Sequence, residues 1–235
     1  MRFSALLTAL FPHVFAQALY TRQSALRLPD AEGPRSGSFG NDENELTVLV
    51  AGESTTAGVG ANHTDEALPA QLAQALADET GIRVHWRADG VTGCRLAAVR
   101  DRLREHPPAE DLVVIASGVN DTTGLTALKH WREQIRETAR AAGARGAGVV
   151  FLAVPPMSHF TALPRPLRTL MGLRARALNA ELDALAHSTG AFTFINWRIP
   201  LVPENLALDG YHPSVSGYRA MAIDCARRLV ERLPM

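Results

Sequence analysis

The chain has 235 residues, which is long enough for one large domain or two small ones with a full hydrophobic core. Its composition, 46% hydrophobic and 20% charged, is ordinary for a soluble globular protein. The 24 lysine and arginine residues balance 24 aspartate and glutamate residues, so no net field attracts nucleic acid. We therefore expect no nucleic-acid partner.

The N-terminal stretch 1–20 is apolar and permits two interpretations. One early charge, an apolar run and the step Ala16-Gln17-Ala18 fit a cleaved signal peptide. Pro12 and His13 interrupt the run, which is short for a bilayer span. The alternative is an apolar helix that packs on the domain or contacts a membrane surface peripherally. We favour the helix, and with it a cytoplasmic protein over an exported one.

Residues 29–46 are rich in Pro, Gly, Ser, Asp and Asn, which is typical of a linker or surface loop. We therefore divide the chain into an N-terminal apolar segment with its linker, 1–46, and a single domain, 47–235.

Within that domain, short apolar β-type runs alternate with stretches of helical periodicity. The predicted strands are 47–52, 82–88, 111–118, 147–154 and 191–197. The predicted helices are 66–80, 94–106, 125–143, 173–188 and 217–233. Five alternations of strand and helix indicate an α/β domain with a parallel sheet and helices on both faces.

Polar loops follow four of these strands, at the sheet edge where α/β domains place their sites. Each loop carries one chemically useful group or pair: Ser54, Gly93, Asn120, and Asp209 with His212. Taken singly, each is more often a turn or a helix cap. Four of them at one edge are much less expected by chance.

These residue types suit nucleophilic catalysis. A serine hydroxyl needs a base, for which His212 is the candidate, and Asp209 would hold the tautomer of that imidazole. A developing oxyanion needs preorganised donors, which the N–H groups of Ser54 and Gly93 and the amide of Asn120 could supply. Gly90 is a rival to Gly93 for this role.

The four blocks together resemble the SGNH hydrolases, also called GDSL-type esterases and lipases. Gly52-Glu53-Ser54 is similar to the family's Gly-Asp-Ser block, and Gly93 occupies the place of its oxyanion glycine. Gly118-Val119-Asn120-Asp121 and Asp209-Gly210-Tyr211-His212 match the third and fourth blocks without change. The resemblance covers about residues 47–233. It implies a three-layer α/β/α, flavodoxin-like fold with a five-stranded parallel sheet, the triad Ser54, Asp209 and His212, and no metal or other cofactor.

The chain departs from the family pattern at two positions. Glu53 is one methylene longer than the usual aspartate, and we expect it to support the turn rather than take part in chemistry. Thr55 replaces the leucine of the GDSL signature.

The segment 155–172 is apolar and leaves the fourth predicted strand on the side of the site. One interpretation is an acyl-binding wall or lid, with Met157, Phe160 and Leu163 as substrate-binding residues. The other is a hydrophobic plug over the core, or a dock for the N-terminal helix.

The leading hypothesis is a serine hydrolase that cleaves carboxylic esters through an acyl-enzyme on Ser54, with acyl ester, lysophospholipid-like or thioester substrates. One alternative is a carbohydrate O-deacetylase on the same site. Another, from a different class, is a non-catalytic flavodoxin-like binding module. The partner expected is a small-molecule or lipid-like ester, and Cys94 and Cys225 are expected as reduced thiols, with a bridge between them as the alternative.

Overall fold

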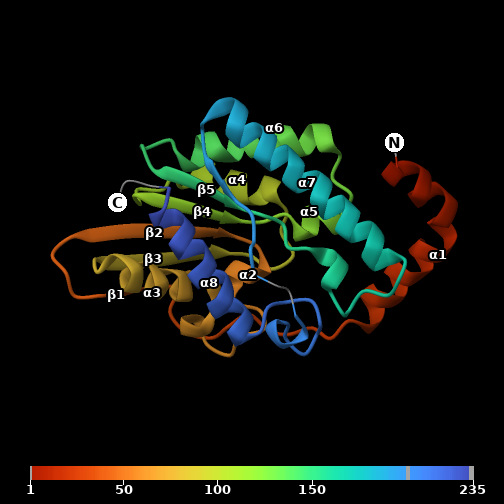
Figure 1. The fold of residues 1–235 in the computed structure, drawn as a ribbon, viewed down its shortest axis with the longest axis horizontal. Coiled ribbons are helices and arrows are strands. Elements are labelled where there is room, and N and C mark those ends of the chain that lie inside the picture. Colours follow the sequence, from red (N-terminus) through yellow and green to blue (C-terminus); the bar gives the residue numbers. More distant parts are fainter. Residues whose placement is uncertain (1, 200–201, 233–235) are drawn as a thin grey trace.

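In a computed structural model, which describes residues 2–199 and 202–232, six strands form one sheet with helices on both faces (Figure 1). The strands are β1 (Ser36–Phe39), β2 (Glu45–Gly52), β3 (Arg83–Gly90), β4 (Leu112–Ala116), β5 (Gly148–Leu152) and β6 (Thr193–Ile195). Their order across the sheet is β1-β3-β2-β4-β5-β6. Strands β2 to β6 run parallel, and β1 pairs antiparallel with β3. The predicted α/β fold is confirmed, with one strand more than the five expected.

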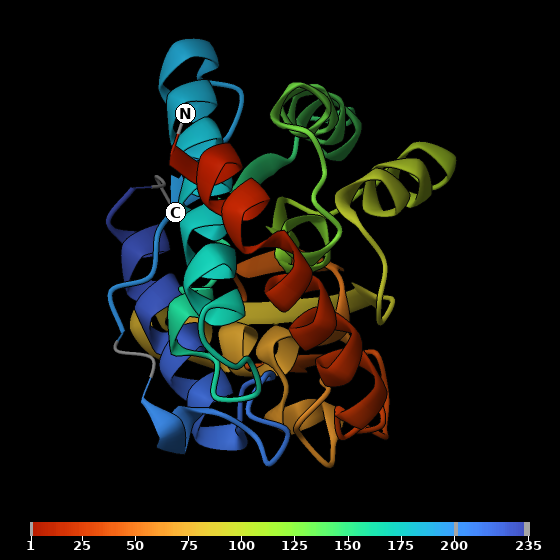
Figure 2. The same ribbon diagram turned by 90° about the vertical axis from the view of Figure 1, so that its right-hand side faces the viewer.

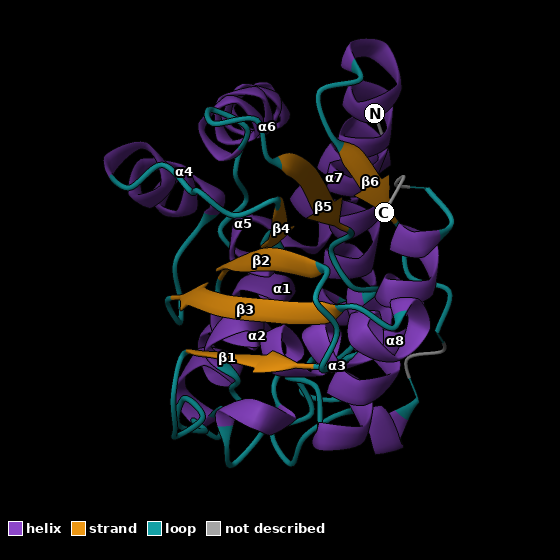
Figure 3. Ribbon diagram, turned by 90° about the vertical axis from the view of Figure 1, so that its left-hand side faces the viewer, coloured by secondary structure: helices purple, strands orange, loops and turns teal. Residues whose placement is uncertain are grey.

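Eight α-helices connect and cover these strands in the described part of the chain. They are α1 (Arg2–Ser24), α2 (Ser54–Ala57), α3 (Leu68–Thr80), α4 (Leu96–Glu105), α5 (Val119–Thr123), α6 (Leu128–Ala142), α7 (Leu167–Thr189) and α8 (Val215–Val230). Helices α3 and α8 cover one face of the sheet, and α4, α6 and α7 cover the other (Figures 1 and 3). Every residue of β4 is buried, as its unbroken apolar run predicts for a central strand between two helical layers.

Strand β1 lies in the region that we expected to be a loop. Its sequence, Ser-Gly-Ser-Phe, has no apolar alternation, and its first three residues are exposed. It pairs from Ser36 opposite Arg87 to Phe39 opposite Val84, at the outer edge of the sheet. An edge strand buries little, so its composition carries no strand signal, and only the pairing with β3 makes it a strand.

Helix α7 begins at Leu167, six residues before the predicted start, and so takes in the end of the segment 155–172. Met157, Phe160 and Leu163 of that segment are all buried in the core beneath α7. Burial, rather than local propensity, accounts for the apolar character of this stretch.

Helix α1 lies alongside α7 (Figure 2). Val14 is buried in the same core as α7, and the Gln17 side chain both donates to the carbonyl of Arg165 at 2.6 Å and accepts from the N–H of Leu167 at 3.2 Å. The segment 155–172 therefore serves as a dock for this helix. Among the described helices, none combines the length and the apolar character needed to cross a bilayer.

The two cysteines do not pair. Cys225 is buried beneath one face of the sheet, and Cys94 lies half-buried against the other. The alternative of a bridge between them is wrong, because the sheet separates them.

Candidate active site

The nucleophile candidate lies where β2 gives way to α2. Strand β2 ends at Gly52, and Ser54 is the first residue of α2. A Cβ on Gly52 would lie 2.2 Å from the carbonyl oxygen of Ala116, so only glycine lets β2 run this close to the end of β4. The turn that follows presents Ser54 at the carboxyl edge of the sheet.

Three side chains form a continuous chain of hydrogen bonds at that edge. The Ser54 Oγ is 2.9 Å from Nε2 of His212, and Nδ1 of His212 is 2.6 Å from Oδ2 of Asp209. The two partners of Ser54 come from the loop before α8, more than 150 residues away in the sequence. The structure thus brings together the three predicted triad residues.

Asp209 is held as a carboxylate by its neighbours. Its Oδ1 accepts the N–H groups of Tyr211 at 2.9 Å and His212 at 3.0 Å. Burial by itself would raise the pKa of Asp209, but the hydrogen bonds from the His212 side chain and from these two N–H groups outweigh it and lower that pKa. An ionised Asp209 fixes a proton on Nδ1 of His212, which leaves Nε2 free to accept from Ser54.

Aromatic rings support the imidazole from one side. The Tyr211 ring meets the His212 ring edge-on at 5.3 Å, and the Phe160 ring meets Tyr211 in the same way at 4.9 Å. Phe160 belongs to the segment 155–172, so this segment supports the His212 imidazole through Tyr211.

Glu53 joins the serine turn to the loop after β4. Its Oε1 accepts the N–H groups of Gly118 at 3.0 Å and Val119 at 2.8 Å, and its Oε2 accepts both the N–H of Asn120, at 3.2 Å, and the Asn120 side-chain amide. Burial raises the pKa of this carboxyl to about 7, although the hydrogen bonds oppose that rise. The expectation that Glu53 supports the turn agrees with these contacts, but its reach to residues 118–120 is a feature that sequence reasoning missed.

Of the predicted oxyanion donors, Asn120 is tied to the serine turn through Glu53. One hydrogen of the Asn120 amide is committed to Glu53, which fixes the direction of the second. Gly93 lies in an exposed turn after β3 with φ +81°, and no hydrogen bond within the described residues uses its N–H. The rival, Gly90, is buried, and a Cβ there would lie 2.4 Å from the backbone nitrogen of Ala57, so its absent side chain serves packing against α2. Gly93 therefore stays our candidate.

A small cavity of about 50 Å³, which we call the catalytic pocket, lies beside Ser54 and His212. Phe160 lines it, whereas Met157 and Leu163 lie deeper in the core and do not. Its apolar wall also includes Leu152, Val154, Trp197 and Met221, none of which we predicted. Trp197 is half-buried, whereas Trp86 and Trp131 are buried in the core.

Two further residues behind the site were also missed. Arg102 on α4 donates to the carbonyl of Gly52 at 3.2 Å and forms an ion pair with Asp89 at 2.9 Å, which ties α4 to the ends of β2 and β3. Asp121 is completely buried and accepts from the N–H of Leu96 at 2.9 Å. Asp121 belongs to the third block, so its presence in that block was the available signal.

Comparisons with known proteins show the family to which the chain belongs. Residues 50–220 match the family model described as the GDSL-like Lipase/Acylhydrolase family. A "GDSL-like esterase Rv1075c" from Mycobacterium tuberculosis is 28% identical over 189 residues, which are 77% of this chain and 60% of that protein. The chain thus spans less than two thirds of that relative's length.

Solved structures share the fold. The crystal structure of TesA is 25% identical, with a TM-score of 0.63 over 80% of this chain and 99% of that one. Est24, a carbohydrate acetylesterase from Sinorhizobium meliloti, is 19% identical, with a TM-score of 0.61 over 80% of this chain and all of that one. The family match extends from β2 to within α8 and includes every residue of the Ser54–His212–Asp209 array. The chain belongs to the GDSL-like lipase/acylhydrolase family.

Proposed function

We propose that the chain hydrolyses carboxylic esters with a short acyl group, through an acyl-enzyme on Ser54. The observation that carries this proposal is the unbroken hydrogen-bond chain from Ser54 through His212 to Asp209, with distances of 2.9 and 2.6 Å. Such an array lets a serine attack a carbonyl at neutral pH.

The first half of the reaction forms the acyl-enzyme. The Ser54 oxygen bonds to the ester carbonyl carbon while its proton passes to Nε2 of His212. The carbonyl oxygen becomes an oxyanion, for which the Ser54 and Gly93 N–H groups and the second hydrogen of the Asn120 amide are the donors. The carbon–oxygen bond to the alcohol then breaks, and the alcohol leaves with the proton from His212.

The second half releases the acid. Water takes the place of the alcohol, and its oxygen bonds to the acyl carbon while its proton passes to Nε2 of His212. The bond from that carbon to Ser54 then breaks as His212 returns the proton to the serine oxygen, and the acid leaves. Asp209 stays ionised throughout and stabilises the imidazolium form of His212.

The size of the catalytic pocket favours a short acyl group. Its volume is about 50 Å³, and a cavity needs roughly 10–15 Å³ on the same measure to hold one water molecule, so the pocket holds only a few. An acetyl or propionyl group fits this space, whereas a long chain needs it to open. Substrates with long chains, such as lysophospholipids or acyl thioesters, are therefore less favoured than our sequence analysis suggested.

Acetylated carbohydrates are the second candidate substrate class. The acetyl-sized pocket supports it, and both Est24 and an acetylxylan esterase, Axe2 from Geobacillus stearothermophilus, share the fold. Trp197 is the one tryptophan of the chain in a position to stack on a sugar at this pocket.

The test is a series of p-nitrophenyl esters from acetate to palmitate, with Ser54→Ala as the control. We expect the acetate to butyrate esters to exceed the palmitate ester in kcat/KM by at least about tenfold, because each extra methylene must find room in the pocket. A profile that rises toward palmitate would contradict the short-acyl proposal.

Labelling separates an enzyme from a non-catalytic binding module. A fluorophosphonate should modify Ser54 in the wild type, as measured by peptide mass spectrometry. In the control variant Ser117→Ala, Ser54 should be modified to the same extent. Absence of the Ser54 adduct, with no turnover of any ester, would support the binding module.

A further inference from the structure

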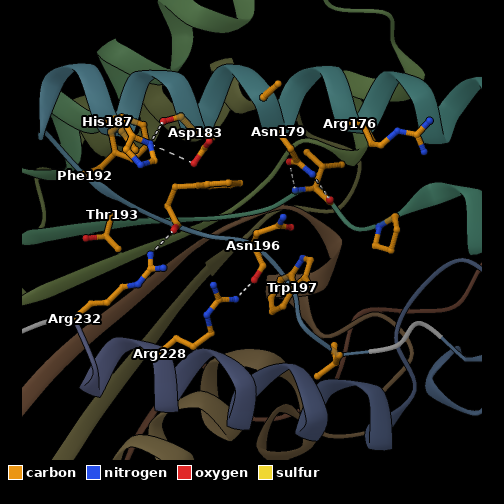
Figure 4. Close-up of a pocket in the computed structure, with 17 residues that line it drawn as sticks. Arg176, Asn179, Asp183, His187, Phe192, Thr193, Asn196, Trp197, Arg228 and Arg232 are labelled. Carbon is orange, nitrogen blue, oxygen red and sulfur yellow. Dashed lines mark hydrogen bonds and ion pairs between the residues drawn. The ribbon is translucent and has the colours of Figure 1, made fainter.

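A large cleft lies along the free edge of β6. Its volume is about 840 Å³, and it lies between α7 and α8 with the chain from Phe192 to Ile199 between them (Figure 4). We call it the β6-edge cleft. Ligand sites for small molecules typically have volumes of 300–1,000 Å³, so this one is large enough to bury such a ligand.

Positive charge is concentrated in this cleft although the chain as a whole is neutral. Three arginines, Arg176, Arg228 and Arg232, line it, whereas Asp183 is its one acidic lining residue and lies 3.4 Å from His187. An excess of cationic side chains in a concave site with low-dielectric walls attracts an anion.

Arg228 of α8 and Arg232, two residues beyond the end of α8, are held in place by the edge of the sheet. Arg232 donates to the carbonyl of Phe194 at 3.0 Å, and Arg228 donates to the carbonyl of Asn196. Each guanidinium has five N–H groups in a planar fork, so one such bond leaves most of its donors for a ligand.

Arg228 has little else to neutralise it. It is 94% buried, its closest carboxylate is Asp224 at 3.8 Å, and its Nε is buried without a hydrogen-bond partner among the described residues. A buried guanidinium whose nearest carboxylate is 3.8 Å away gains from an oxyanion that bonds to its remaining terminal N–H groups.

Apolar side chains line another part of the cleft. Phe194, Trp197 and Ile199 are half-buried and line it. Val154 and Trp197 line the catalytic pocket as well, so the two cavities share a wall.

We propose that the β6-edge cleft binds an anionic amphiphile, an apolar chain that ends in a carboxylate or a phosphate. The head group bonds to Arg228 and Arg232, and the chain lies against Phe194 and Trp197. This site is distinct from the Ser54 centre, and its test does not depend on ester turnover.

The test measures binding by calorimetry on the wild-type chain. The probes are decanoate, decyl phosphate and decanol, each below its aggregation concentration. We expect both anions to bind at least about tenfold more tightly than decanol, since a charge-assisted hydrogen bond contributes that much. A stronger response to one anion than to the other identifies the head group, and equal binding of all three probes would overturn the proposal.

Two variants near the C-terminal end of α8 test the head-group contacts. Arg232→Gln should weaken binding of decanoate about tenfold and leave decanol unchanged. Arg227→Gln is the matched control, because the neighbouring Arg227 is exposed and pairs with Glu79 on α3, outside the cleft. The same loss in both variants, or a loss in neither, would contradict the assignment.

Two variants of α7 test where the apolar chain of the ligand lies. Ala180 is exposed and lines the cleft, so Ala180→Trp should fill it and abolish decanoate binding while the circular dichroism spectrum stays that of the wild type. Ala184 is exposed on the same helix but does not line the cleft, so Ala184→Trp should bind decanoate as tightly as the wild type does. If Ala180→Trp is folded, as shown by circular dichroism, and still binds decanoate as tightly as the wild type, the ligand lies elsewhere and the proposal is overturned.

Discussion

The catalytic pocket and the β6-edge cleft share Val154 and Trp197 as a wall, yet they differ in size and in how their charged groups are paired. The carboxyl groups next to Ser54 and His212 are fully hydrogen-bonded: Glu53 accepts four hydrogen bonds, and Asp209 accepts three. In the β6-edge cleft, the buried Arg228 keeps an unpaired donor.

This difference separates two uses of buried charge. A catalytic array must be rigid before the substrate arrives, so its charged groups are fully bonded within the protein. A binding site gains affinity from donors that the protein itself does not satisfy. The predictions below test this contrast, from the largest expected effect to the smallest.

The largest effect should come from the triad. Ser54→Ala and His212→Ala should each lower kcat for p-nitrophenyl acetate by at least about 10,000-fold, because members of such an array act as a unit. The measurement is steady-state kinetics with circular dichroism to confirm folding. Ser117→Ala is the matched control, since Ser117 lines the same pocket but its Oγ bonds to nothing in the described structure, and it should stay within a few-fold of wild type. Turnover near the wild-type rate by either triad variant would remove the proposed mechanism.

The next effect concerns Asn120. If its second amide hydrogen points to the oxyanion, Asn120→Ala should lower kcat by roughly 100- to 1,000-fold and leave KM nearly unchanged, because the interaction forms in the transition state. If the amide serves only Glu53, the variant should lose about 1 kcal/mol of stability and little rate. Kinetics and urea unfolding of the same sample distinguish the two.

Glu53 should make stability depend on pH. Its pKa is raised by burial to about 7 from an ordinary value of 4.5, so between these values the native state holds a proton that the unfolded state has lost. The contribution of Glu53 to the free energy of unfolding should therefore be highest below pH 4.5. It should fall by up to about 3 kcal/mol as pH rises to 7, and change little above that.

Urea unfolding at pH 5, 6, 7 and 8 measures this slope in the wild type and in Glu53→Gln, which lacks the titrating group. The difference between the two proteins removes the contribution of the histidines, which both contain. Glu110→Gln is the control: although partial burial opposes it, the hydrogen bond to Arg87 lowers the pKa of Glu110, so this variant should keep the wild-type slope. Identical slopes in the wild type and in Glu53→Gln would show that Glu53 is ionised throughout.

The smallest effect should come from the shared wall. Trp197→Ala would join the catalytic pocket to the β6-edge cleft, and we expect the ratio of octanoate to acetate ester hydrolysis to rise about tenfold. Trp197→Phe keeps an aromatic wall and loses only the hydrogen bond from Nε1 to the carbonyl of Ala153 at 2.7 Å, so it should keep the wild-type ratio. An unchanged ratio in Trp197→Ala would mean that the two cavities are independent in the protein.

The sequence by itself determined the layered α/β fold and the chemistry-bearing residues. Buried parallel strands are continuous apolar runs, and surface helices repeat every 3.6 residues, so both signals are local. Ser54, Asn120, Asp209 and His212 could be found because each follows a strand or precedes a helix in a recognisable block.

Only the tertiary structure decided the remaining features, since they depend on residues distant in sequence. Strand β1 exists through its pairing with β3, because its own composition indicates a loop. Glu53 binds a loop 65 residues further along the chain. The burial of Met157 and Leu163 follows from the packing of α7 above them. The β6-edge cleft arises where α7, β6 and α8 meet. No periodicity or motif shows that Arg176 of α7 and Arg228 of α8 line the same space.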